Sequence, residues 1–335
     1  MIHTLNRQIL ITEAGSPDVM KLIESPIPAP GPKQIRIRIQ AAGISYADIM
    51  MRQGSYPAPP SKFPFVPGIE LVGIVDAIGS QVQHLHTGQR VGALPRGGGY
   101  ADYICVDAYS VIPLPDGADA HDALSIMMNY VTAYQMLHRS AAIKPHARIL
   151  IHGAAGGVGS ALLQLGRLMN LEIYGTASPA KLALVESLGA TAVDYKNTDF
   201  VEELMQQVPS GFDAIFDPIG GSHLKRSYRL LAKDGRLVVF GFQHAGTKKE
   251  VFRSVLPMLR LRMKWNRKRV KFYTLPIMIR LRKQWFQDDL RTLFDLLQQG
   301  QIQPVISKRL PLQEAAYAHA LMEQGAIHGK MILIP

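Results

Sequence analysis

A glycine-rich turn between an apolar strand and a helix is the most informative chemical feature of this sequence. The strand Arg148–His152 runs into the turn His152–Gly159, and a helix is predicted over Val158–Met169. Glycines let phosphate groups approach the backbone closely, and the unpaired N–H groups of a helix N-terminus attract negative charge. The alternative is a tight packing turn without a ligand. If the turn binds a dinucleotide, the contacts are expected from Ala155, Gly156, Gly157, Val158 and Gly159.

The end of the next predicted strand indicates which dinucleotide fits. An acid there would bind the ribose 2′-hydroxyl of NAD and would repel the 2′-phosphate of NADPH. This strand ends in Gly175–Ser178, and no acid follows before Glu186. Ser178 can donate a hydrogen bond and Lys181 can bring positive charge to a phosphate, while Tyr195 ends the third strand. The pattern favours NADPH, although Lys181 alone could be a solvated helix residue and Tyr195 alone a packing residue.

These residues belong to a segment in which strands and helices alternate, which is typical of a doubly wound parallel sheet. A helix with Asp119 as its N-cap is predicted to precede this segment, over Ala120–His138. The predicted strands are 148–152, 171–175, 190–194, 213–217 and 235–240, and the predicted helices are 158–169, 179–188, 200–208 and 223–231.

The first 120 or so residues differ, because prolines and glycines are too dense for long helices. Gln34–Ala41 alternates isoleucine with polar residues, the pattern of a half-buried strand, and Leu71–Ile78 is a second apolar run. We expect an all-β barrel or a strongly bent sheet here. After a helix over Gln284–Gln299, the closing strand Lys330–Ile334 is expected to return to this first domain.

Length and composition are those of a globular protein with two domains, since the chain has 335 residues and 47% of them are hydrophobic. One cysteine, Cys105, excludes an intramolecular disulfide. No signal sequence or long apolar span is visible, so a cytoplasmic location is expected.

The net charge of +11 is concentrated in Lys248–Lys283, which has thirteen Lys or Arg and one acid, Glu250. Such a segment can be a solvated rim that attracts cofactor phosphates, can lie on an anionic membrane, or can bind nucleic acid, the least favoured reading. It can also meet a dimer partner through an edge strand over 269–275. Basic residues at helical spacing, with apolar ones on another side, are Arg260, Lys264, Arg267, Lys268, Lys271 and Leu256, Leu259, Met263.

Motifs along essentially the whole chain resemble the medium-chain dehydrogenase/reductase superfamily. The segments that resemble the first-domain landmarks of this superfamily are Ala41–Asp48, Arg52–Pro57, Phe65–Glu70 and Gly88–Val91. The quinone oxidoreductase branch is matched by Asn129–Tyr134, the glycine turn and Gly329–Leu333, and its vesicle amine transport protein homologues by Met128–Tyr134, Tyr174–Ser178 and Phe216–Ser222.

This resemblance implies an α/β protein with a GroES-like β-barrel catalytic domain, a Rossmann domain, a ligand cleft between them, and homodimers formed at the Rossmann sheet edge. The catalytic domain would comprise residues 1–122 and 296–335, and the NADPH-binding domain residues 123–295. It further implies that Asn129 and Thr132 lie near the nicotinamide and that Phe240, Gly241 and Phe242 form a turn beside it.

Metal-dependent members of the superfamily place a cysteine where Ser45 stands and a histidine where Ile69 stands. Neither residue is a usual zinc ligand, and one cysteine cannot build a four-cysteine site. No metal is therefore expected, and the resemblance implies NADPH-dependent reduction of quinones or α,β-unsaturated carbonyls by direct hydride transfer.

Reduction of such a substrate creates an oxyanion that needs a hydrogen-bond donor and a proton. The candidate donors are Tyr56, Tyr46 and Ser45, and Tyr56 occupies the Gly-x-Tyr-Pro position of related enoyl-thioester reductases. Alternatively both tyrosines are aromatic walls of the pocket. Asp48 and Arg52 are expected to form a structural pair. The competing functions are an enoyl-thioester reductase and a low-activity NADPH-binding adaptor at membrane surfaces.

Overall fold

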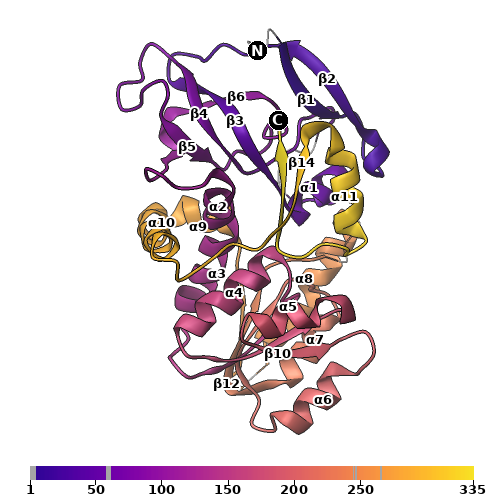
Figure 1. The fold of residues 1–335 in the computed structure, drawn as a ribbon. Helices are drawn as coiled ribbons and strands as arrows, with labels where there is room; N and C mark the ends of the chain where they lie inside the picture. The colour runs from indigo at the N-terminus through magenta and orange to yellow at the C-terminus, as the bar shows by residue number, and fades with distance from the viewer. Residues whose placement is uncertain (1–4, 58–61, 244, 246, 265) are drawn as a thin grey trace. The chain divides into compact units, whose positions relative to one another are not determined.

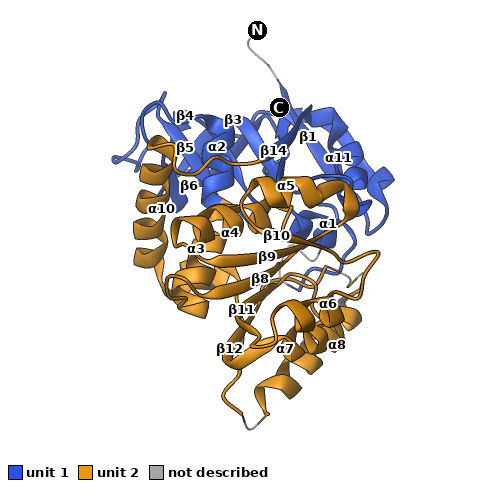
Figure 2. Ribbon diagram, turned by 60° about the horizontal axis from the view of Figure 1, so that its bottom comes forward, with its two compact units in different colours: residues 1–127, 306–335 blue, residues 128–305 orange. Residues whose placement is uncertain are grey.

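In the computed structural model the chain forms two compact units, residues 1–127 with 306–335 and residues 128–305 (Figure 2). The structure describes residues 5–57, 62–243, 245, 247–264 and 266–335. Each unit has its own sheet.

Unit 2 is built on a six-stranded sheet in the order β10-β9-β8-β11-β12-β13, with every neighbouring pair parallel. The side chains of Ile149, Leu150 and Ile151 are all fully buried, because helices cover both faces of a sheet of this kind. The doubly wound sheet expected from the sequence is confirmed. Its strands are β8 (Arg148–His152), β9 (Glu172–Ala177), β10 (Thr191–Asp194), β11 (Phe212–Asp217), β12 (Leu231–Val239) and β13 (Arg269–Phe272).

The helices of unit 2 are divided between the two faces of this sheet, with α4 and α5 on one face and α6 and α7 on the other (Figure 2). Among the described residues, no helix is long and apolar enough to cross a membrane. The helices are α3 (Val131–Gln135), α4 (Gly157–Leu168), α5 (Leu182–Ser187), α6 (Phe200–Gln207), α7 (His223–Arg229), α8 (Lys248–Arg262), α9 (Leu275–Leu281) and α10 (Lys283–Gln298).

Two predictions for helices have different outcomes. Asp119 caps the helix that begins at Ala120, because its carboxylate accepts hydrogen bonds from the backbone N–H groups of His121 and Asp122. The helical spacing expected over 256–271 is wrong beyond Met263, because helix α8 ends there and strand β13 follows. Lys271 lies in β13, where side chains alternate between the two faces of the sheet, so its spacing from the other basic residues does not indicate a helix.

Unit 1 contains a seven-stranded sheet centred on β3, an eleven-residue strand that pairs with β4, β6 and β15. Two register shifts in the pairing of β3 with β4 allow the sheet to bend. Its strands are β3 (Gln34–Ile44), β4 (Leu71–Ile78), β5 (Arg90–Ala93), β6 (Tyr103–Asp107), β7 (Val111–Pro113), β14 (Ile306–Pro311) and β15 (Lys330–Ile334).

The remaining elements of unit 1 pack around this sheet (Figure 1). The C-terminal strand β15 pairs antiparallel with β3, with Met331 opposite Ile44, so the expected return of the chain to its first domain is confirmed. The other elements are the hairpin β1 (Leu5–Ile11) and β2 (Met20–Pro26) and the helices α1 (Tyr46–Arg52), α2 (Ala120–Ser125) and α11 (Ala315–Glu323).

Candidate functional site

Five loop segments follow the carboxyl ends of neighbouring strands of unit 2, and all of them except 218–221 were predicted to bind a dinucleotide. Because these strands are parallel, their carboxyl ends lie along one edge of the sheet, which is where such folds bind ligands. The segments are 153–159 after β8, 178–181 after β9, Tyr195 after β10, 218–221 after β11 and 240–242 after β12.

The glycine turn is shaped by close backbone contacts. Gly153 adopts a φ of 65°, which favours glycine. A Cβ on Gly159 would lie 2.6 Å from the carbonyl oxygen of Ala154 and closer still to that of Gly153. A Cβ on Gly156 would lie 3.3 Å from the carbonyl oxygen of Gly153, a tight contact that a small shift could relieve. Packing therefore restricts Gly156 much less than Gly159.

Helix α4 begins directly after this turn and leaves its N-terminus available to a ligand. Its N-cap is Gly156, and no side chain caps the first backbone N–H groups. Gly157 and Val158 are partly exposed, whereas Ala155 is buried. Uncapped N–H groups and the positive end of the helix dipole together suit a pyrophosphate.

Two lysines lie close together beyond the ends of β9 and β10. Burial lowers the pKa of Lys181, and the positive charge of Lys196 lowers it further. The backbone N–H of Tyr195 bonds to the carbonyl oxygen of Ala177 at 3.4 Å, which brings the end of β10 against Ser178. The sequence reasoning missed Lys196, and its position directly after Tyr195 was the signal that could have found it.

The loops after β11 and β12 are joined at the same edge. The N–H of Phe240 bonds to the carbonyl oxygen of Asp217 at 3.0 Å. A Cβ on Gly241 would lie 2.6 Å from the carbonyl oxygen of Pro218, and one on Gly220 would lie 2.6 Å from the ring of Phe242. The segment 240–242 is thus a close-packed backbone turn, and Phe242 is buried.

Asn129 and Thr132 are buried in the helical segment that opens unit 2. Asn129 lies in a turn of π-helix over 126–130, a distortion that is frequent at functional sites. Burial raises the pKa of Tyr273 well above its usual value, and a hydrogen bond with Thr132 opposes the rise. Thr132 therefore already has a partner on the inner side of unit 2.

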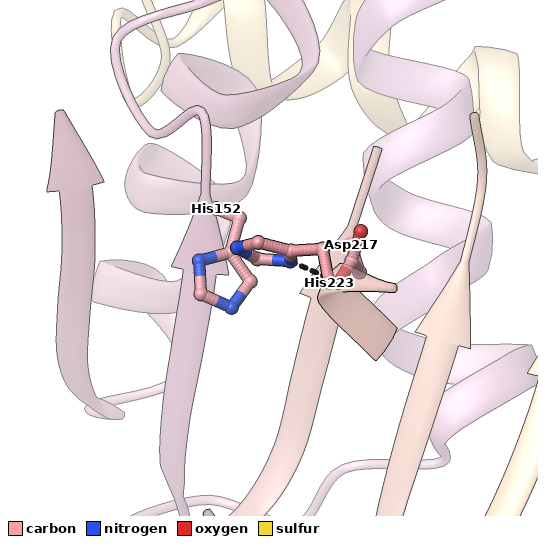
Figure 3. A group of neighbouring side chains, drawn as sticks. All are labelled: His152, Asp217 and His223. Carbon is pink, nitrogen blue, oxygen red and sulfur yellow. Dashed lines mark hydrogen bonds and ion pairs between the residues drawn. The ribbon is translucent and has the colours of Figure 1, made fainter. Parts of the chain in front are cut away.

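A buried polar network lies under the glycine turn and was not anticipated. It involves His152 at the end of β8, Asp217 at the end of β11 and His223 at the start of α7 (Figure 3). Ser227 joins them, because its hydroxyl is 2.8 Å from Asp217 Oδ2 and 3.1 Å from His152 Nε2. His152 Nδ1 lies 3.0 Å from the hydroxyl of Thr176 on β9.

The ionisation states decide which groups of this network donate hydrogen bonds and which accept them. Burial would raise the pKa of Asp217, but the hydrogen bond from His223 and the charges of His152 and His223 bring it down to about 2. Burial lowers the pKa of His152 to about 3, so this ring is neutral. Ser227 donates its one proton to Asp217 and accepts from His152 Nε2, which leaves His152 Nδ1 to accept from Thr176. Three strand ends are thereby fixed together.

The same three side chains are the only group of three or more potential metal ligands in the part of the chain that the structure describes. The Ser227 hydroxyl sits among them, at 3.1 Å from His152, 2.8 Å from Asp217 and 3.3 Å from His223. Metal–ligand bonds would be about 2.0–2.2 Å, and the hydroxyl already satisfies these groups. The cluster is a hydrogen-bonded network rather than a vacant metal site.

In unit 1, Ser45 caps helix α1 in a reciprocal capping box with Asp48. The Ser45 hydroxyl donates to Asp48 Oδ2 at 2.7 Å, and Oδ2 also accepts from the Ser45 N–H at 2.9 Å. A hydroxyl held this way has its proton engaged, so the structure assigns Ser45 a capping contact that the sequence reasoning had not foreseen.

Tyr46 and Tyr56 lie at the two ends of the α1 region and are partly buried. Burial raises the pKa of both phenols, with Glu323 adding to the rise at Tyr46 and Asp48 at Tyr56. Both side chains are therefore protonated at neutral pH and can donate a hydrogen bond.

The expected pair of Asp48 and Arg52 is wrong, because each residue has other partners. Asp48 Oδ1 accepts from the backbone N–H of Gly68 at 3.1 Å, and burial raises its pKa to about 6 despite the hydrogen bonds. The fully buried Arg52 forms an ion pair with Glu323 on α11. Both residues are structural, as expected, but they connect α1 to different segments.

Residues 31–116 match the alcohol dehydrogenase GroES-like domain, and residues 188–333 match the family described as zinc-binding dehydrogenase. The synaptic vesicle membrane protein VAT-1 homolog of Rattus norvegicus is 33% identical, over 98% of this chain and 84% of that protein. The chain belongs to the medium-chain dehydrogenase/reductase superfamily.

Other members of this oxidoreductase superfamily are equally well covered. Quinone oxidoreductase of Lama guanicoe is 30% identical over 98% of both chains. The Escherichia coli quinone oxidoreductase solved with NADPH has a TM-score of 0.89 at 27% identity and covers 98% of this chain and 100% of its own. The human VAT-1 homolog-like protein gives 0.82 at 27% identity. The expected family and its GroES-like and Rossmann-type domains are confirmed.

Proposed function

We propose that this oxidoreductase reduces quinones or α,β-unsaturated carbonyls with NADPH and without zinc. The observation that carries the proposal is the pair of cations, Lys181 and Lys196, beyond β9 and β10 where an NAD-binding protein would need an acid. Two lysines that repel each other gain most from a ligand that carries a phosphate. The NADPH complex of the E. coli relative supports the same choice.

NADPH would supply the hydride, and the residues of unit 2 would hold it in place. The uncapped N-terminus of α4, which begins after Gly156, would receive the pyrophosphate. Ser178, Lys181, Lys196 and Tyr195 would surround the 2′-phosphate. The close-packed turn of Phe240, Gly241 and Phe242, with Asn129 and Thr132, would border the nicotinamide.

The absence of zinc from the proposed reaction depends on the residues at the family's ligand positions. Ser45 has its hydroxyl engaged in the helix cap with Asp48, and Ile69 has no ligand atom. A quinone or enone is already electrophilic, so orientation and hydrogen bonding are sufficient for hydride transfer.

Tyr56 is proposed as the donor to the oxyanion that forms on the substrate. Burial and the negative charge of Asp48 keep its phenol protonated, so it can donate a hydrogen bond and then a proton. Tyr46, at the other end of α1, is proposed as an aromatic wall of the pocket. Tyr56→Phe should lower kcat and leave KM nearly unchanged, whereas Tyr46→Phe keeps the aromatic ring and should change neither constant much.

We further propose a cytoplasmic homodimer. Strand β13 ends the strand order of the described sheet, so one of its edges is open to a second copy. Sedimentation should then give twice the monomer mass, and a monomer would refute this part alone.

Titration of the purified protein with NADPH and with NADH, followed by addition of phenanthrenequinone, simple enones or an enoyl-CoA, tests the central proposal. Tight NADPH binding and acceptor-dependent oxidation of NADPH are expected. Turnover of the enoyl-CoA alone would favour an enoyl-thioester reductase. Binding without turnover of any acceptor would favour an adaptor, and no binding would refute the proposal.

A further inference from the structure

Helix α8 (Lys248–Arg262) has two apolar faces, and only one of them is buried in unit 2. The inner face packs Val251, Met258 and Leu261, which are 5–6% exposed. A second apolar stripe is exposed: Phe252 at 79%, Leu256 and Leu259 each at 45%, and Met263, at the end of the helix, at 76%. Spacings of four, three and four residues place these side chains on one side of the helix.

The exposed stripe is not explained by packing. Single exposed apolar residues are ordinary on protein surfaces, but a contiguous group marks an interaction surface. Phe252 and Met263 each leave more than three-quarters of their surface in water. The helix would be equally well anchored by its inner face if these two residues were polar.

Positive charge borders this stripe. Lys249, Arg253 and Arg260 are exposed and lie on one side of the helix, next to the apolar stripe, because two of them directly follow a stripe residue. The one acid between Lys248 and Lys283 is Glu250. Its carboxylate accepts from the N–H of Thr247 at 3.1 Å in the capping box, at the N-terminal end of the helix.

We propose that α8 binds the surface of an anionic lipid bilayer. Phe252, Leu256, Leu259 and Met263 would enter the boundary between headgroups and acyl chains, and the basic residues would contact the phosphates and carboxylates of the lipids. The residues of this stripe are not among those proposed to hold NADPH, so binding to the bilayer does not require the cofactor.

Charge and hydrophobicity together select this partner. A second copy packed stripe against stripe would bring Lys249, Arg253 and Arg260 of both copies together around an apolar contact, and like charges repel. A nucleic acid would neutralise the cations but would leave Phe252 and Met263 in water. An anionic bilayer satisfies both kinds of residue.

The test is co-sedimentation of the full chain with vesicles of phosphatidylcholine, with and without phosphatidylserine. Binding is expected only with phosphatidylserine and should weaken as salt increases. Loss of three cations should lower the partition coefficient on the order of 100-fold, and loss of the two exposed apolar side chains at least about tenfold. The variants are K249Q/R253Q/R260Q and F252S/M263S.

Control variants remove the same charge, or two exposed apolar side chains, elsewhere on the chain. The residues replaced are all exposed, so the controls should bind vesicles like the native protein. F252L retains an apolar side chain and should also bind, which separates loss of the stripe from loss of the fold. The controls are K21Q/K225Q/K308Q and Y109S/M205S.

Several results would overturn the proposal. These are absence of binding to the phosphatidylserine vesicles, equal losses in the control variants, and binding that survives both α8 variants. A change of oligomeric mass in F252S/M263S without a change in vesicle binding would assign the stripe to a second copy of the chain.

Discussion

Removal of the two lysines beyond β9 and β10 should change the cofactor preference of this protein. Lys181→Ala and Lys196→Ala each delete one charge-assisted contact to the proposed 2′-phosphate. Such a contact contributes about 1.5–3 kcal/mol when it is dry. Lys181 is partly buried and Lys196 is exposed, so solvent screening reduces each contribution to about 1 kcal/mol or less.

The expected result is therefore a rise of up to about fivefold in the Kd for NADPH in each single variant and up to about 30-fold in the double variant. The Kd for NADH should change by less than about threefold, because NADH lacks the 2′-phosphate. Lys225→Ala, an exposed lysine on α7, removes the same charge and should leave both affinities unchanged. Fluorescence titration of each variant with both cofactors measures these values.

The pH dependence gives a second check on the same pair. The pKa of Lys181 is lowered by burial and by Lys196. As pH rises, Lys181 should therefore lose its proton, and the preference for NADPH should decline, at a lower pH than with an ordinary lysine. Lys196→Ala removes the repulsion and should move that decline to higher pH. Equal weakening of NADPH and NADH, or a shift in the opposite direction, would refute the assignment.

Three further predictions concern the glycine turn and the network beneath it. Gly159→Ala should destabilise the fold by about 1–3 kcal/mol, because its Cβ would overlap two carbonyl oxygens, whereas Gly156→Ala should leave urea denaturation nearly unchanged and weaken NADPH binding about tenfold or more. Ser227→Ala should lower the free energy of unfolding, measured by urea denaturation, by about 2 kcal/mol, because the buried His152 and Asp217 lose the hydroxyl that they share. A decrease below about 0.5 kcal/mol would contradict the stabilising role of the network. His152 is neutral in the folded protein, with a pKa of about 3. Its contribution to the free energy of unfolding is therefore complete above its usual pKa of about 6.5 and falls as pH falls, by about 2 kcal/mol at pH 5. His152→Gln should remove this part of the loss of stability in acid, and an unchanged loss would refute the assignment of a neutral His152.

Much of the fold follows from local sequence pattern. Strands β4, β8 and β15 have the expected bounds, because apolar runs ended by glycine or polar residues are local signals. Boundaries were less accurate where neighbouring elements compete, as in β12, which begins at Leu231 where a helix was expected to end. The pairing of β12 with β11 decides this boundary, and pairing is not a local property.

The candidate site also has parts that local sequence predicts and parts that it does not. The glycine turn, Ser178 and Lys181 were identified from the sequence because each follows a strand at a fixed offset. The buried network around Ser227 was missed, because its members come from parts of the chain that are distant in sequence. Their proximity depends on strand order and is not visible in any window of sequence. Lys196 was missed as well, although its position directly after Tyr195 could have pointed to it.

By itself the sequence determined the alternation of strands and helices, the glycine-rich turn between strand and helix and the concentration of positive charge, since all three are properties of residue type and spacing. The tertiary structure decided which groups are already engaged. It tied the Ser45 hydroxyl to Asp48, paired Arg52 with Glu323, and left Phe252 in water. Burial and hydrogen bonding depend on the whole packed chain, and they determine whether a polar or apolar side chain remains free to bind a ligand.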